Sequence, residues 1–196
     1  RSAAGTITYA TSEDLETWTK WEGGPIKAAE GLDPFLKNRN GRCYLYYTGA
    51  TGVEAMVTED MITWESLPPV LHNPQRSQAE SCSVHTLKDR HVLWYNDYLH
   101  VADPTGDFRA VYIFSDDPLK FDYCNLMSFA FETQLQTDYG STDWLEKRPI
   151  PVGIELVAKG KNLWLLAYFR WHIDRFRLFF GALDWTQSPA KIEEIV

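Results

Sequence analysis

The sequence of 196 residues has only three cysteines, Cys43, Cys82 and Cys124, and no two of them stand at a metal-binding spacing such as C-x-x-C. An odd number of widely separated cysteines indicates neither a disulfide framework nor a zinc site. The histidines show no metal-ligand spacing either. We therefore expect free, buried thiols, and we predict neither a metal nor a cofactor.

The sequence also lacks a long apolar run and an excess of basic residues. No apolar stretch approaches the roughly 18 to 20 residues that span a bilayer, so we expect no transmembrane segment. The formal net charge is -8, which argues against nucleic acid or an anionic membrane as partner, because both attract basic surfaces. A neutral polar ligand fits better. Residues 1–15 lack the regions of a signal peptide, which leaves the compartment open.

Long helical patterns are missing as well, and short aromatic and β-branched runs separated by Gly, Asn, Asp and Pro predict antiparallel strands and hairpins. An acidic turn recurs after four of these runs. Its copies are "TSEDLETW" at 11–18, "VTEDMITW" at 57–64, the looser "FSDDPLKF" at 114–121 and the faint "ALDWTQSP" at 182–189. Short oxygen-bearing side chains hold such a turn by hydrogen bonds to nearby backbone N–H groups.

The recurring unit of strand, turn, strand, loop, strand and acidic turn predicts an all-β protein with a β-propeller fold in a single domain, 1–196. A β-sandwich is the alternative, but it does not require the same acidic turn at the same place in each unit. The expected blades are 5–28 (partial), 31–72, 79–136 and 150–196. A ring needs about four blades, so we expect a missing segment or another chain to complete this propeller of three and a half blades.

Two acids head expected inner strands, Asp33 in "GLDPF" and Glu80 in "QAESCSV". Inner strands of a propeller begin near its axis, so residues that head them meet in one pocket although they are far apart in sequence. Two carboxylates in one polar pocket are the equipment of glycoside hydrolysis, in which one acid protonates the leaving oxygen. Solvated carboxylates at loop ends are the simpler interpretation of this pattern alone.

The combination of "GLDPFLKNRNGRCYLYYTG", "SEDLETW", "TEDMITW" and "AESCSV" resembles the five-bladed propeller glycosidases of glycoside hydrolase family 43, and more distantly family 32. The likeness is clearest over residues 5–97. It implies that Asp33 tunes and positions and that Glu80 is the general acid, while the base would lie on an inner strand upstream of Arg1. The Asp-Pro lacks the preceding Arg, and "AESCSV" lacks the Glu-Cys pair, that family 32 would show.

Four further residues are candidates for substrate binding. Asp97 in "WYNDYLH" could contact sugar hydroxyls, with a turn-forming Asn-Asp pair as the simpler account. Glu155 stands near the start of the fourth expected inner strand, where a surface or hydrogen-bonded glutamate is the alternative. Arg170 and Trp171 end its second strand and could bond hydroxyls and stack on a sugar ring, or simply pack and be solvated there.

Three functions remain open at this point. The resemblance implies a glycosidase acting on arabinosides or xylosides of plant-type oligo- or polysaccharides, with a carbohydrate as its partner. A non-catalytic carbohydrate-binding propeller and a structural interaction propeller are the alternatives, because a fold does not fix a function. The resemblance also slightly favours an extracellular or periplasmic location.

Overall fold

The structure is a computed structural model that describes residues 5–26, 31–50, 52–72, 78–87, 89–98, 108–128, 130–131, 151–159, 163–172, 175–185 and 191–194. Within these ranges the chain is all-β, and the only helical element is a single 3-10 turn, η1 (Tyr123–Asn125). No helix in these ranges has the length and hydropathy needed to cross a membrane.

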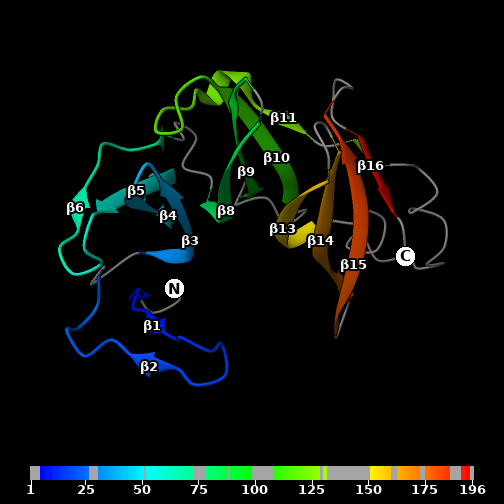
Figure 1. The fold of residues 1–196 in the computed structure, drawn as a ribbon. Helices are drawn as coiled ribbons and strands as arrows, with labels where there is room; N and C mark the ends of the chain where they lie inside the picture. The colour runs from blue at the N-terminus through cyan, green and yellow to red at the C-terminus, as the bar shows by residue number, and fades with distance from the viewer. Residues whose placement is uncertain are drawn as a thin grey trace.

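The strands form four sheets that follow one another in chain order around an arc (Figure 1). The first sheet pairs β1 (Ala10–Thr11) with β2 (Thr19–Lys20). The second holds β3 (Leu32–Arg39), β4 (Arg42–Gly49), β5 (Gly52–Thr58) and β6 (Glu65–Ser66), and β7 (Leu71–His72) also pairs with β5. The third holds β8 (Gln78–Thr86), β9 (His91–Tyr98), β10 (Phe108–Ser115) and β11 (Met127–Ser128). The fourth holds β13 (Pro151–Lys159), β14 (Leu163–His172), β15 (Arg175–Asp184), β16 (Lys191–Glu194) and β12 (Ala130–Phe131).

The pairing is antiparallel except at one edge of the fourth sheet. There β12 runs parallel to β16, so residues 130–131 join the fourth sheet although they lie within the range 79–136 predicted for the preceding blade. The division of the chain into blades otherwise stays a prediction.

The hairpin of β3 and β4 shows how the local sequence builds these sheets. Its two-residue turn is Asn40-Gly41, with φ of 53° and 79°. Positive φ at both positions defines the type I′ turn, whose twist matches that of paired strands, and Asn-Gly is its preferred sequence. The turn sets Arg39 opposite Arg42, and this register places the first residues of β3 beside the last residues of β4.

Strand β4 is buried on both faces because the second sheet is covered on both sides. Tyr46 belongs to a core cluster shared with the third sheet, where Leu93 and Tyr95 are buried. Leu45 and Tyr47, which alternate with it, pack against Ile7 of the N-terminal segment. The period of two therefore carries apolar residues to both faces, as in a sheet enclosed between layers.

The third and fourth sheets meet through aromatic rings. Trp185, which follows β15, lies edge-on to Tyr112 and Phe114 of β10, with ring centroids 5.2 and 5.6 Å apart. Trp185 belongs to the faint fourth copy of the acidic turn, and it is 7% exposed. Its ring therefore joins one sheet to the preceding one, a use of aromatics that gives both area burial and a preferred geometry.

The three inner strands β3, β8 and β13 are neighbours, because β8 contacts both β3 and β13. Consecutive sheets arranged around an arc with their first strands together are typical of propeller blades. The chain thus has a propeller-type all-β architecture. The count of five blades and the missing segment remain predictions.

The three cysteines are free thiols in different environments. Cys82 is buried, Cys43 is half-buried and Cys124 is exposed. The expectation that all three are buried is therefore wrong for Cys124, which lies in η1 outside the strands.

Candidate active site

The three inner strands, β3, β8 and β13, have the same irregularity near their start. In each, the register to the next strand shifts by one residue, between Leu32 and Phe35, between Glu80 and Ser83, and between Val152 and Glu155. In each case two residues of the inner strand lie opposite one residue of the next strand: 33–34 opposite Tyr47, 81–82 opposite Tyr95 and 153–154 opposite Tyr168. Bulges of this kind re-aim side chains and are frequent next to active sites.

Asp33 lies in the first of these bulges and Ser81 in the second, and they bond to each other. The backbone N–H of Ser81 donates to Oδ2 of Asp33 at 2.9 Å. Both residues have positive φ, 49° for Asp33 and 54° for Ser81, a conformation that residues other than glycine adopt at a cost. The carboxylate of one inner strand is thereby fixed to the backbone of the next.

The bond places Asp33 beside the residue that follows Glu80, so the structure brings the starts of these two acidic strands together. Asp33 itself is exposed. Glu80 lies in β8, directly opposite Asn96 of β9. The strand at Glu80 is described, but its side chain lies outside the described part of the structure, and its role as acid stays a prediction.

A buried thiol completes the contact between the two strands. Sγ of Cys82 lies 4.0 Å from the backbone oxygen of Asp33. Burial, and secondarily the charge of Asp33, raise the pKa of Cys82 well above its ordinary value, because both disfavour the thiolate. Cys82 is therefore a protonated packing residue under the bulge and not a nucleophile.

Asp97 lies inside β9, between β8 and β10. The alternative of a turn-forming Asn-Asp pair is therefore wrong. Asp97 is fully buried, and its Oδ2 accepts a hydrogen bond of 3.4 Å from the hydroxyl of Tyr123. The Tyr123 hydroxyl of η1 thus gives this buried carboxylate a hydrogen-bond donor. Contact between Asp97 and a sugar remains a prediction.

The other predicted residues lie at the matching end of the fourth sheet. Arg170 is opposite Pro151, the first residue of β13, and Trp171 follows it in β14. Glu155 comes just after the bulge of β13. The register therefore puts all three near the start of the inner strand, as predicted from the sequence, but their side chains lie outside the described part of the structure.

The acidic turns lie elsewhere, at the outer strands. In the first, Oδ1 of Asp14 accepts hydrogen bonds from the N–H groups of Glu16 (2.9 Å) and Thr17 (2.7 Å), and from the Ser12 hydroxyl (3.0 Å). These bonds, that of Thr17 first, lower the pKa of Asp14 to about 2. The carboxylate closes the turn, as the sequence predicted.

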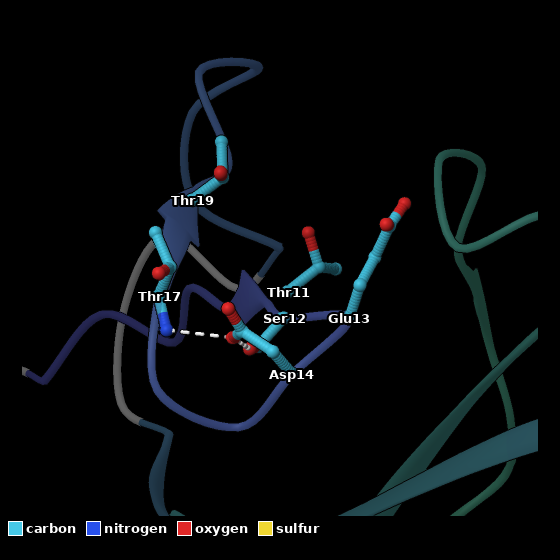
Figure 2. A pocket seen from close by; sticks show the side chains of 6 residues that line it. All are labelled: Thr11, Ser12, Glu13, Asp14, Thr17 and Thr19. Carbon is cyan, nitrogen blue, oxygen red and sulfur yellow. Dashed lines mark hydrogen bonds between the residues drawn. The ribbon is translucent and has the colours of Figure 1, made fainter.

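Two surface hollows lie at these turns and not at the inner strands. One of about 560 Å³ is lined by Thr11, Ser12, Glu13, Asp14, Thr17 and Thr19 (Figure 2). The other, of about 430 Å³, includes Thr58, Glu59 and Asp60 of the second turn. Because the same hollow recurs beside the same turn, and Asp14 already bonds to backbone N–H groups there, we attribute both to turn geometry and place the candidate site at the inner strands.

Sequence reasoning missed two participants of the inner site. The Ser81 N–H has no sequence signature, since any residue but proline carries one. Asn96 was noted only as a turn former, although counting back along the hairpin from its turn pairs Asn96 with Glu80. The strand register predicted for this hairpin, with one bulge allowed, could have placed Asn96 opposite Glu80.

No protein-family model and no curated protein sequence match this chain. Solved structures do match its fold. The GH32 β-fructofuranosidase BmSUC1 of Bombyx mori aligns with 97% of this chain and 47% of its own, at a TM-score of 0.70 and 13% identity. The GH93 α-L-arabinofuranosidase of Fusarium graminearum, solved with arabinobiose, aligns with 95% and 57%, at 0.61 and 15%.

A third match is Zg3597, a family 117 glycoside hydrolase of the marine bacterium Zobellia galactanivorans. It aligns with 84% of this chain and 55% of its own, at a TM-score of 0.59 and 13% identity. This chain spans about half the length of these three structures. Several glycoside hydrolase families share the fold, so the matches do not separate family 43 from family 32. The chain has the fold of the propeller glycoside hydrolases, as the resemblance of its motifs predicted.

Proposed function

We propose that this chain forms part of a propeller glycosidase that cleaves O-glycosidic bonds of plant-type oligo- or polysaccharides, of the arabinoside or xyloside type. Glu80 is the general acid, and Asp33 positions the acid and the sugar. Two matched structures support a carbohydrate as the ligand, since one was solved with sucrose and another with arabinobiose.

The hydrogen bond from Ser81 to Asp33 is the observation that carries this proposal. It ties the start of β3 to the start of β8 within one residue of Glu80. Because Asp33 is exposed, its remaining acceptor positions face outward, where a sugar hydroxyl can reach them. Leu15 and Met61 of the outer turns also have positive φ, so it is the link between two inner strands, and not the backbone conformation alone, that supports a site here.

The chemistry follows from the two carboxyl groups. Glu80 delivers a proton to the departing sugar oxygen, and a nearby negative charge from Asp33 disfavours ionisation of Glu80, so the proton is retained until it is needed. A further carboxylate, besides Glu80 and Asp33, must activate water or attack the sugar. The resemblance assigns that carboxylate to an inner strand preceding residue 1, so the activity is a property of the full-length protein.

The test is Glu80→Gln in the full-length protein, compared on a natural arabinoside or xyloside and on an aryl glycoside with a good leaving group. The amide cannot deliver a proton, so kcat/KM on the natural substrate should fall about 10²- to 10⁴-fold, while the aryl glycoside suffers much less. Glu59→Gln is the control, because Glu59 lies exposed at an outer turn and should leave both rates unchanged.

Equal activity of wild type and Glu80→Gln on the natural substrate would remove Glu80 from the mechanism. If the full-length wild type binds oligosaccharides by calorimetry but cleaves none of them, the chain belongs to a carbohydrate-binding propeller instead.

A further inference from the structure

Asn96 occupies an unusual position for an amide. It lies in the central part of the third sheet, paired with Glu80 of β8 on one side and with Ala110 of β10 on the other. Residues directly opposite each other in antiparallel strands lie on the same face of a sheet and are close enough to interact. Asn96 is therefore the cross-strand neighbour of the proposed acid.

The amide of Asn96 is buried and has no hydrogen-bond partner among the described residues. The residue is 0% exposed, and neither Oδ1 nor Nδ2 finds a partner within the described part of the chain. Its other cross-strand neighbour, Ala110, offers no polar side-chain atom. Buried polar groups are nearly always paired, so one whose donor and acceptor are both unpaired needs an explanation.

We propose that Asn96 is a positioning residue that holds the Glu80 carboxyl group in place and in its protonated form. This inference rests on the proposed function of Glu80. A neutral carboxyl group has one O–H donor and one C=O acceptor, which match the acceptor Oδ1 and the donors on Nδ2 of the amide. A carboxylate only accepts, so it would leave Oδ1 without a donor and facing a negative charge. The amide therefore favours the protonated acid.

Other ionisable residues lie at this end of the elements around β8. They are Asp33 of β3, Cys82 of β8 itself, Asp97 of β9, Arg109 of β10, Tyr123 of η1 and Glu155 of β13. His85 and His91 lie toward the opposite end of the β8–β9 hairpin. All of them stay unchanged when residue 96 is replaced, so a difference between variants at this position reports the contact between residue 96 and the acid.

Two substitutions of similar size test the proposal in opposite directions. Asn96→Leu removes the hydrogen bonds that we propose to the Glu80 carboxyl group. Asn96→Asp replaces the amide with a group that carries the same charge as ionised Glu80. The pKa of Glu80 is measured by residue-specific ¹³C NMR titration of the full-length protein, a measurement that needs no activity. It should fall by about one pH unit in Asn96→Leu and rise by about one in Asn96→Asp. The basic limb of the kcat/KM profile of the full-length protein should move with it, and kcat should fall while KM stays nearly constant.

The two variants also distinguish the proposed positioning role of Asn96 from a purely structural role. A structural amide would lose thermal stability on replacement by leucine without moving the Glu80 titration, whereas a positioning amide shifts that titration whatever the melting temperature does. If Asn96→Asp does not fold, because it buries a charge, the Asn96→Leu titration decides alone.

An unchanged Glu80 pKa in Asn96→Leu overturns the inference. A raised KM with an unchanged pH profile does so as well, since it assigns Asn96 to sugar binding. These failures are separate from failure of the proposed function: if Glu80→Gln loses natural activity while Asn96→Leu shifts nothing, only the inference is wrong. If Glu80→Gln keeps that activity, the proposed function is wrong whatever residue 96 does.

Discussion

The inner starts and the outer turns of this fold both use an aspartate close to a residue of positive φ, with opposite results. At the outer turn, Oδ1 of Asp60 accepts hydrogen bonds from the N–H groups of Ile62 and Thr63, two and three residues away. At the inner end, Asp33 accepts from Ser81, which is 48 residues away. The first aspartate closes its own turn, and the second joins two sheets.

The difference shows where the fold satisfies its polar groups locally and where it does not. The outer turn is repeated nearly atom for atom: the indole N–H of Trp18 donates to the Leu15 oxygen at 3.3 Å, and that of Trp64 to the Met61 oxygen at 3.2 Å. The inner ends instead have bulges, and in the third sheet the buried amide of Asn96 has no partner within the described part of the chain. Departures from local consistency are expected at functional sites.

Replacing each aspartate by asparagine separates the two regions, and this gives the largest effect we expect. Asp33→Asn should lower kcat/KM of the full-length protein about 10- to 100-fold, on natural and activated substrates alike, because it displaces both the acid and the sugar. Asp60→Asn keeps an acceptor oxygen in the turn and should leave kcat/KM unchanged. Steady-state kinetics of the two variants measure this.

Equal losses in the two variants would contradict the assignment of catalysis to the inner ends. A loss in Asp60→Asn alone would move the site to the hollow beside the second turn, whose lining includes Asp60.

The fold could be predicted from the sequence because its signals are local. The Asn40-Gly41 turn, the alternation in "RCYLYY" and the repeated Ser/Thr-x-Asp turn each depend on residues within one hairpin. Strong local preferences that agree with one another specify such elements. The all-β, propeller-type architecture confirms the fold class that these signals predict, and the division into blades stays a prediction.

The inner site was predictable only in part, because it depends on contacts between units. Asp33 and Glu80 could be placed at the starts of neighbouring strands, but the sequence does not show a one-residue bulge or the N–H of Ser81. The strand β12 shows the same limit, because its parallel pairing with β16 joins residues about 60 apart. Asp97 was predicted to contact sugar hydroxyls or to form a turn, and no local feature of the sequence indicated that it is buried beside Tyr123.

The pH dependence of stability should differ between Asp60 and an exposed acid in another outer turn. The bonds from Thr63 and Ile62 lower the pKa of Asp60 from 3.8 to about 2. A carboxyl group whose pKa is lowered on folding stabilises the fold above its unfolded pKa, and that contribution is lost as the pH falls through the folded pKa. Asp60→Ala should therefore lower the melting temperature by about a few degrees above pH 4, and the difference from wild type should shrink between about pH 4 and 2.

Asp116→Ala is the matched control for this titration, since Asp116 is exposed in the third acidic turn. Its melting temperature should follow that of wild type across the whole range. A difference between Asp60→Ala and wild type that is constant down to pH 2 would show that the charge of Asp60 does not act through the turn.

The smallest expected effect concerns the residue that follows the aspartate in the outer turn. Leu15 has a φ of 63° and is 77% exposed. Its left-handed conformation is therefore unfavourable, and packing of its side chain offsets little of that cost. Glycine adopts this conformation without the Cβ clash. Leu15→Gly should therefore raise the free energy of unfolding by about 0.5 to 1 kcal/mol, after the greater freedom of glycine in the unfolded chain is subtracted. Urea unfolding measures this difference, with Glu13→Gly as control, because Glu13 is not among the described residues of positive φ and its replacement should destabilise.

Met61 has nearly the same φ in the second turn but is half-buried, so Met61→Gly should gain less stability. If Leu15→Gly destabilises as much as Glu13→Gly, the left-handed residue is not a source of strain in the outer turn.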